Sequence, residues 1–97
     1  MKITRLEDCE SSAVAMEGAA GASRRVPIGK ADGAPNISAR VFTLGPGGHT
    51  PHHTHTSEHL NYVISGEGVA MEGETPRDIK KGDFILVKPD QLHQYRN

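Results

Sequence analysis

Short runs of alternating apolar and polar residues, separated by glycine and proline, make up most of the chain. In a strand, successive side chains point to opposite faces, so this pattern predicts strands rather than helices. Gly45 to Gly48 are expected to end the second strand, and Gly66 to Gly68 to turn the chain back. Such spacing predicts an antiparallel sandwich or barrel with little helix. The expected strands cover residues 23–28, 36–44, 59–65, 69–72, 77–80, 83–88 and 91–96.

Residues 7–20 fit two local structures. The segment is rich in alanine and could form a turn or two of helix, capped by Ser11-Ser12 and ended by Gly18. The alternative is an edge strand over 13–16. In either case we expect one domain over residues 1–97, with an N-terminal arm over about 1–22 and a barrel over about 23–97.

Composition excludes several functions. The 97 residues carry 11 Lys and Arg against 12 Asp and Glu, without the basic patch that is typical of nucleic-acid binders. No apolar run approaches the ~18 residues of a membrane span, and the first 16 residues lack the apolar core of a secretory signal. The single cysteine, Cys9, excludes an internal disulfide and is expected to be a bystander. We therefore predict a cytoplasmic protein with no nucleic-acid or membrane partner.

Histidine is the most informative residue type, because five of the six histidines lie between positions 49 and 59. If this segment is extended, His53 and His55 share one face and His59 has the same parity, whereas His52 points the other way. Imidazole suits zinc, copper, iron and nickel, so converging histidines would form a metal site. His49, like His52, is expected to take no part.

Two spaced motifs resemble those of the cupin superfamily. Gly47-x5-His53-x-His55-x3-His59-x6-Gly66 is similar to the first cupin motif, in which glutamate is more common at the position of His59. Gly82-x10-His93-x3-Asn97 is similar to the second motif. Within it, Pro89 stands one residue later than usual and Asp90 stands where glycine is common. The resemblance covers about residues 36–97.

The resemblance implies an all-β jelly-roll barrel, also called a double-stranded β-helix, with a metal ion in its mouth. With histidine at position 59, the motif resembles that of the small single-domain cupins that have four histidine ligands. This resemblance implies one divalent transition ion (Mn, Fe, Ni, Zn or Cu) held by His53, His55, His59 and His93. Similar cupins usually continue for one or two strands beyond the position of Asn97, so the chain is expected either to lack its last strands or to be covered there by a partner subunit.

Four neutral ligands would cancel none of the charge of a divalent ion. The divalent state is then favoured over the trivalent one, and an anionic or enolate substrate is attracted. An ion that prefers six ligands would keep two open positions for a substrate or for a substrate and dioxygen.

Strand parity also predicts residues of a pocket beside the ion. Asn61 and Val63 share the face of His59, and Gln91 and Tyr95 share the face of His93. Tyr95 is expected to donate a hydrogen bond to a substrate or to fill the barrel. Glu58 precedes His59 and should point away from the ion, so it could act as a base only through a bend.

The opposite face of the His59 strand carries Leu60, Tyr62 and Ile64, which would point out of a barrel. Three large apolar groups on an outer face require a cover. With only four aromatic residues, the core is also light for a chain of this size. We therefore expect a homodimer or a second layer over this face.

The sequence supports three functions. The first is a metal-dependent enzyme, most readily a dioxygenase, acting on a small enolisable or phenolic molecule. The second is a non-catalytic module that binds or senses a small molecule, with the metal as structure or anchor. The third, a structural zinc protein, has the least support, because such zinc sites usually include cysteine and no cysteine lies near the histidine cluster.

Overall fold

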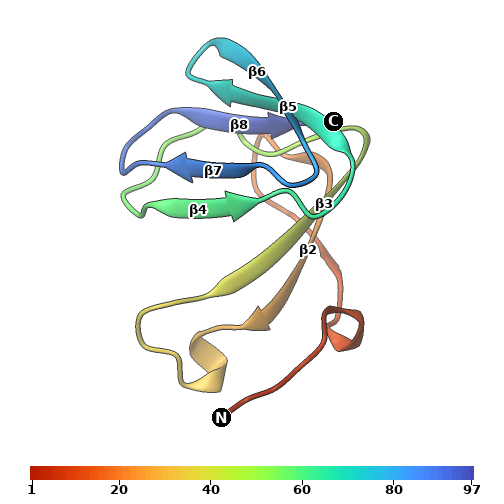
Figure 1. Cartoon of the computed structure of the whole chain (residues 1–97), viewed down its shortest axis with the longest axis vertical. Helices are drawn as coiled ribbons and strands as arrows, with labels where there is room; N and C mark the ends of the chain where they lie inside the picture. Colours follow the sequence, from red (N-terminus) through yellow and green to blue (C-terminus); the bar gives the residue numbers. More distant parts are fainter.

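A computed structural model describes all residues from 1 to 97 (Figure 1). It contains eight strands and two short 3-10 turns, and every strand pair is antiparallel. The all-β prediction is therefore confirmed, and no helix has the length and apolar character that a membrane span requires. The elements are η1 (Leu6–Asp8), β1 (Ser12–Ala13), β2 (Ala20–Ile28), η2 (Lys30–Asp32), β3 (Ala39–His49), β4 (His59–Tyr62), β5 (Glu67–Glu72), β6 (Thr75–Lys80), β7 (Phe84–Val87) and β8 (His93–Arg96).

The strands form two sheets. The larger has the order β1-β2-β3-β8-β5-β6, and the smaller consists of β4 and β7 (Figure 1). A hydrogen bond from the Asn61 side chain on β4 to the Tyr95 hydroxyl on β8 joins the two sheets through the interior. The strand β8 thus lies at the centre of the large sheet, next to the space between the two layers.

The glycine-rich segment Gly45 to Gly48 does not end a strand, contrary to the sequence prediction. The strand β3 begins at Ala39 and runs through this segment to His49. The pairing with β2 shifts here, because Leu44 lies opposite Ala22 but His49 lies opposite Ala20. Glycine allows this bulge, since Gly47 adopts a positive φ of 71° without a side-chain penalty.

The turn at Gly66 also differs from expectation, because it does not make a hairpin between neighbouring strands. The strand β4 pairs with β7, whereas β5 pairs with β6 and β8. The chain therefore passes from the small sheet to the large one at this point. Crossing between layers places the outer face of β4 far from its sequence neighbours on β5.

Neither prediction for residues 7–20 is correct as stated. The segment forms no α-helix; a single 3-10 turn ends at Asp8, and a two-residue strand covers Ser12–Ala13. That strand does lie at the edge of the large sheet, one residue earlier than the edge-strand alternative proposed. The strand β2 begins at Ala20, so the last residues of the expected arm belong to the large sheet.

The interior is small. Only three apolar side chains, Pro51, Met71 and Val87, are buried, and they are accompanied by the polar residues His93 and Gln94. Many large apolar side chains are exposed instead, including Leu60, Tyr62 and Ile64, as their parity predicts. A polar histidine in so small an interior requires a partner, since burial of an unpaired polar group is costly.

Candidate metal centre

Two imidazole rings, those of His55 and His93, lie close together, with their centroids 4.7 Å apart and their planes nearly perpendicular. The Nε2 atoms of His55 and His93 lie 3.2 Å apart. Two nitrogens that bind one ion at about 2.1 Å, at an angle between 90° and 110°, are separated by about 3.0–3.4 Å. The spacing of this pair therefore fits two ligands of a single metal ion.

The hydrogen bonds of the same two rings determine which nitrogen faces the site. The Nδ1 atom of His55 lies 2.7 Å from the carbonyl oxygen of Ser57, and that of His93 lies 2.8 Å from the carbonyl oxygen of Gln91. A carbonyl oxygen only accepts, so each Nδ1 carries the proton and donates it. Both Nε2 atoms then present lone pairs to each other. Two facing lone pairs repel each other, so this arrangement favours a cation bound by both nitrogens, and such outer hydrogen bonds are typical of metal-binding histidines.

His53 completes a group of three. One nitrogen from each of His53, His55 and His93 lies within 4.8 Å of the others. The backbone of His53 exchanges two hydrogen bonds of 3.1 Å with the backbone of His93, which fixes the two residues side by side. Three histidines are thus close enough to hold one metal ion.

The reasoning that predicted this convergence was only partly sound. Parity assumed an extended strand around His53 and His55, but the segment between β3 and β4 contains only the isolated bridge from His53 to His93. The side chains converge because backbone hydrogen bonds attach this segment to β8 and to the turn before it. One of these runs from the Asp90 N–H to the His55 carbonyl, at 2.7 Å.

His59 lies beside this group rather than within it. Its ring centroid is 4.1 Å from that of His55, at an angle of 35° between the planes. It begins β4 and is the most exposed of the four predicted ligands. The structure therefore brings all four predicted ligands to one location but gathers only three of them tightly.

The turn that leads into β8 departs from the usual second motif and still positions His93. Asp90 adopts a positive φ of 64°, the only residue other than glycine to do so. Aspartate tolerates this left-handed conformation better than most residues. Asp90 therefore takes the conformation for which glycine is common at this position.

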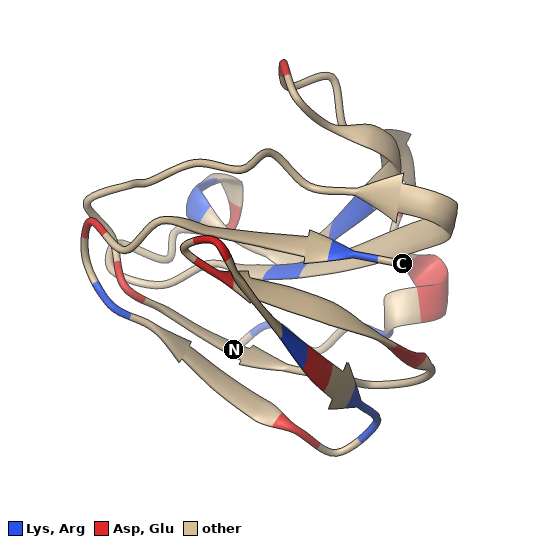
Figure 2. Ribbon diagram, turned by 90° about the horizontal axis from the view of Figure 1, so that it is seen from above, with Lys and Arg blue, Asp and Glu red and all other residues tan.

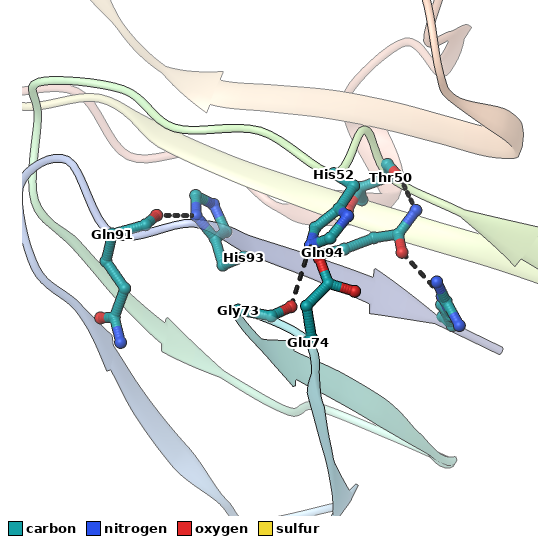
Figure 3. A network of polar contacts seen from close by, with 8 residues as sticks. Thr50, His52, Gly73, Glu74, Gln91, His93 and Gln94 are labelled. Atoms are coloured by element: carbon teal, nitrogen blue, oxygen red, sulfur yellow. Dashed lines mark hydrogen bonds and ion pairs between the residues drawn. The ribbon is translucent and has the colours of Figure 1, made fainter.

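The remaining two histidines in the sequence cluster point elsewhere. His52 lies 2.9 Å from the carbonyl oxygen of Gly73 and 3.9 Å from the Glu74 carboxylate, at the turn between β5 and β6 (Figure 3). His49 lies at the end of β3, where its Nδ1 is 3.2 Å from the Thr50 carbonyl. Neither belongs to the group of three.

A cavity of about 270 Å³ opens next to His93. It lies between β7 and the strands β5, β6 and β8, and its lining includes the predicted residues Gln91 and Tyr95. Asn61 and Val63 are not part of the lining. Asn61 reaches it indirectly, through its 2.6 Å hydrogen bond to the Tyr95 hydroxyl.

None of the four charged residues that line this cavity was predicted from the sequence; they are Glu72, Arg77, Asp78 and Asp83. Glu72 lies directly opposite His93 in the β5–β8 register, and its carboxylate is 3.2 Å from the Arg77 guanidinium. The side-chain amide of Gln91 approaches the same carboxylate at 3.5 Å. The position of Glu72 next to His93 follows only from the strand pairing, since nothing in the local pattern around Glu72 indicates which strand lies beside it. Glu58, the base considered from the sequence, is exposed instead.

Burial also acts on the titratable groups of the site. Desolvation raises the pKa of Tyr95, which outweighs the opposing effect of the Asn61 hydrogen bond. The phenol is therefore protonated at neutral pH and can donate a hydrogen bond. Desolvation lowers the pKa of His53, and the neighbouring His93 and His55 lower it further. Desolvation also lowers the pKa of His59, followed by the effect of the neighbouring His55. Both imidazoles are neutral at pH 7, as metal binding requires.

These shifts predict acid sensitivity of the metal-free protein. The pKa of His53 and His59 lies below the ordinary value of 6.5, so the unfolded chain binds protons more tightly than the folded one. The free energy of unfolding should fall as the pH drops below about 6.5 and level off below the folded-state values. Urea unfolding at pH 7.5 and pH 5.0 measures this, and a double variant His53→Gln/His59→Gln should show less dependence. An equal dependence in the variant would contradict the assignment.

Basic and acidic residues are interspersed along the ribbon (Figure 2). A sequence profile of the cupin domain matches residues 40–97, more than half of the chain. The chain belongs to the cupin superfamily. The prediction made from the two motifs is confirmed, and the two antiparallel sheets are those of a cupin-type jelly-roll barrel.

Solved structures of other proteins share this fold. A polyketide cyclase from Streptomyces resistomycificus superposes with a TM-score of 0.94 at 26% identity, over all of this chain and 70% of that one. A cupin-2 domain protein from Rhodospirillum rubrum superposes with a TM-score of 0.80 at 23% identity, over 98% of this chain and 64% of that one.

A curated relative matches over a shorter segment. The 1-methylthio-D-xylulose 5-phosphate methylsulfurylase of Rhodospirillum rubrum is 32% identical over 57 residues. The match covers 59% of this chain and 36% of the relative. The chain thus spans about a third of the length of this enzyme.

Proposed function

We propose that this cupin is a metal-dependent enzyme that acts on a small enolisable or phenolic molecule. The observation that carries the proposal is the pair of Nε2 lone pairs, 3.2 Å apart, in a histidine cluster whose member His93 also lines a cavity. Two similar proteins support it, because both are named as enzymes and both a polyketide and a xylulose are ketones.

His53, His55 and His93 would hold one divalent transition ion, and His59 would be the fourth ligand. When bound, such an ion would polarise a carbonyl or enol oxygen and position a second reactant, which in a dioxygenase is dioxygen. Imidazole binds several divalent transition metals, so this donor set suits zinc, copper, iron and nickel alike.

The chain's own residues supply binding and orientation around that ion. The Tyr95 hydroxyl accepts a hydrogen bond from Asn61, which leaves its own proton free to donate to a substrate oxygen in the cavity. The raised pKa of Tyr95 keeps that proton in place. Ile85 and Val87 line the wall contributed by β7 and would contact an apolar part of the same molecule.

A non-catalytic binding module is the second candidate, and one observation favours it. The carboxylate that lines the cavity next to His93, Glu72, is already engaged by Arg77 and Gln91. An engaged carboxylate is a poor general base, because its charge is stabilised where it stands. The two candidates differ in whether a bound enol is consumed.

Metal analysis of untagged protein, followed by titration with acetylacetone and catechol, tests the proposal. We expect about one transition ion per chain, binding of at least one probe to the metal-loaded protein, and no binding to metal-free protein. Consumption of a probe together with dioxygen indicates a dioxygenase, consumption without dioxygen indicates another reaction, and binding alone indicates the second candidate. A chain that binds no transition ion would contradict both. Tyr95→Phe should weaken probe binding about tenfold without changing metal content.

A further inference from the structure

The strand register places Arg77 of β6 on the inner face of the large sheet. Tyr95 on β8 lies opposite Ala70 on β5, and Ala70 lies opposite Arg77. Side chains that lie opposite each other in antiparallel strands project from the same face of the sheet. The Tyr95 hydroxyl accepts its hydrogen bond from Asn61 on the small sheet, so this face is the inner one. Arg77 and Tyr95 therefore flank the small side chain of Ala70, and all three line the cavity beside His93.

The guanidinium of Arg77 has donors that the chain does not use. A guanidinium carries five N–H groups, and here one nitrogen, Nη1, donates to the Glu72 carboxylate at 3.2 Å. This contact is the only side-chain hydrogen bond or ion pair of Arg77 within residues 1–97. The Gln91 amide approaches the same carboxylate at 3.5 Å, so two donors share its charge. The Glu72 contact thus restrains the guanidinium and leaves its other donors available to a ligand.

Two further carboxylates line the cavity, and neither forms an ion pair with Arg77. Asp78 follows Arg77 in β6 and lies opposite Val69, so its side chain projects from the other face of the sheet. The Asp83 carboxylate accepts a hydrogen bond of 2.8 Å from the Lys80 N–H, which holds it at the turn between β6 and β7. The guanidinium is therefore shared with a single carboxylate.

The other side chains of the cavity wall include apolar groups from both sheets. Ile79 shares the inner face of Arg77 on β6, and Ile85 lines the cavity from β7. Arg77 on β6 and His93 on β8 lie on either side of β5 (Figure 1). Because neighbouring strands are about 4.8 Å apart, their backbones are separated by about 10 Å or more. This separation accommodates a small ring that carries polar groups at its two opposite ends.

We infer that Arg77 is a specificity-determining residue that binds a carboxylate of the substrate, so the substrate class is an acidic enol or phenol. The enol or phenol oxygen would bind at the histidine cluster, and the carboxylate would accept the free N–H groups of Arg77. The planar guanidinium matches the geometry of a carboxylate. A singly charged carboxylate also suits a guanidinium that is shared with Glu72 better than a doubly charged phosphate does. The inference rests on the proposed function, since it names the substrate class of the same site.

Two probes that differ by one charge, 3,4-dihydroxybenzoate and its methyl ester, test the inference on the unaltered protein. Both carry the same catechol group, and zinc, which is redox-inactive, serves as the bound metal. Calorimetric titration at pH 7.5 should show that the acid binds about tenfold more tightly than the ester. Equal affinities overturn the inference alone. If neither probe binds, the inference falls together with the proposed function.

Arg77→Leu then locates the preference for the acid. It should reduce the ratio of the two affinities at least about fivefold, while the metal content stays unchanged. Lys80→Leu is the matched control, because it removes the same charge from the same strand at a position outside this cavity. A preference that survives in Arg77→Leu, or that Lys80→Leu lowers equally, overturns the inference.

The loss of Arg77 also leaves the charge of Glu72 uncompensated, and this charge would repel the acid by itself. The double variant Arg77→Leu/Glu72→Gln separates the two effects, because it removes both charges and leaves the net charge unchanged. The preference for the acid should stay lost. If it returns, repulsion by Glu72 explains the single variant and the inference is overturned. The comparison of the two probes on the unaltered protein needs no variant, so it decides even if a variant does not fold.

Discussion

Replacing His93 with alanine should weaken binding of a divalent transition ion by more than about 100-fold. Loss of outer hydrogen-bond partners alone costs 10- to 100-fold in metal affinity, and this change removes a ligand. His93 is also the most buried of the four histidines and faces both His53 and His55. Competition against a fluorescent chelator, with zinc or manganese as the probe, measures the affinity.

His52→Ala is the control for this experiment, because His52 is a neighbour in sequence whose ring contacts the Gly73 carbonyl instead. It should bind the ion like the unaltered chain. His59→Glu should be the mildest change among the four ligands, since glutamate is common at that position in cupins, and it should ease oxidation of bound iron or manganese by adding a negative charge. If His52→Ala lost the ion while His59→Ala kept it, the assignment of ligands would be wrong.

Replacing Gly48 with alanine should lower the free energy of unfolding by about 1–3 kcal/mol. An added Cβ at this position would lie 2.6 Å from the Gly21 carbonyl oxygen and 2.9 Å from that of Gly45. Both are backbone atoms of the bulged pairing between β2 and β3, so neither can rotate away. Against a typical stability of 5–15 kcal/mol, and with so small a core, such a loss is large.

Urea unfolding of Gly48→Ala and Gly45→Ala measures this effect. Gly45 lies in the same segment, but a Cβ there would be 3.6 Å from the nearest atom, an ordinary contact. Gly45→Ala should therefore change the stability by no more than about 0.5 kcal/mol. Equal losses in the two variants would show that the segment requires glycine for its flexibility rather than for the close approach of β2.

The sequence revealed the fold class because strands of this kind depend on local patterns. Alternation and the glycine and proline positions predicted six of the eight strands to within a few residues. They could not predict the run through Gly45 to Gly48, because a bulge is favoured by the partner strand and not by the segment itself. They also missed the crossing at Gly66, since the turn residues are the same for a hairpin and for a connection between layers.

For the site, residue types and motif spacing were more informative than periodicity. The histidines were identifiable because few other patterns place four of them at these intervals. The cavity residues Glu72 and Arg77 were not, because they enter it only through the pairing of β5 with β6 and β8. Long-range pairing is the information that a single sequence does not display. It also determines which charged groups lie next to His93.

The exposed turn at Asp90 helps to set the geometry of the candidate metal centre. Its N–H holds the carbonyl of His55, and three residues later the same backbone presents His93. The two facing imidazoles are therefore linked through one exposed turn. A substitution there that disfavours the positive φ, such as Asp90→Val, would change the spacing of the nitrogens without altering any ligand. Among related proteins, mutations at this surface turn could therefore change the metal selectivity while the histidine ligands remain unchanged.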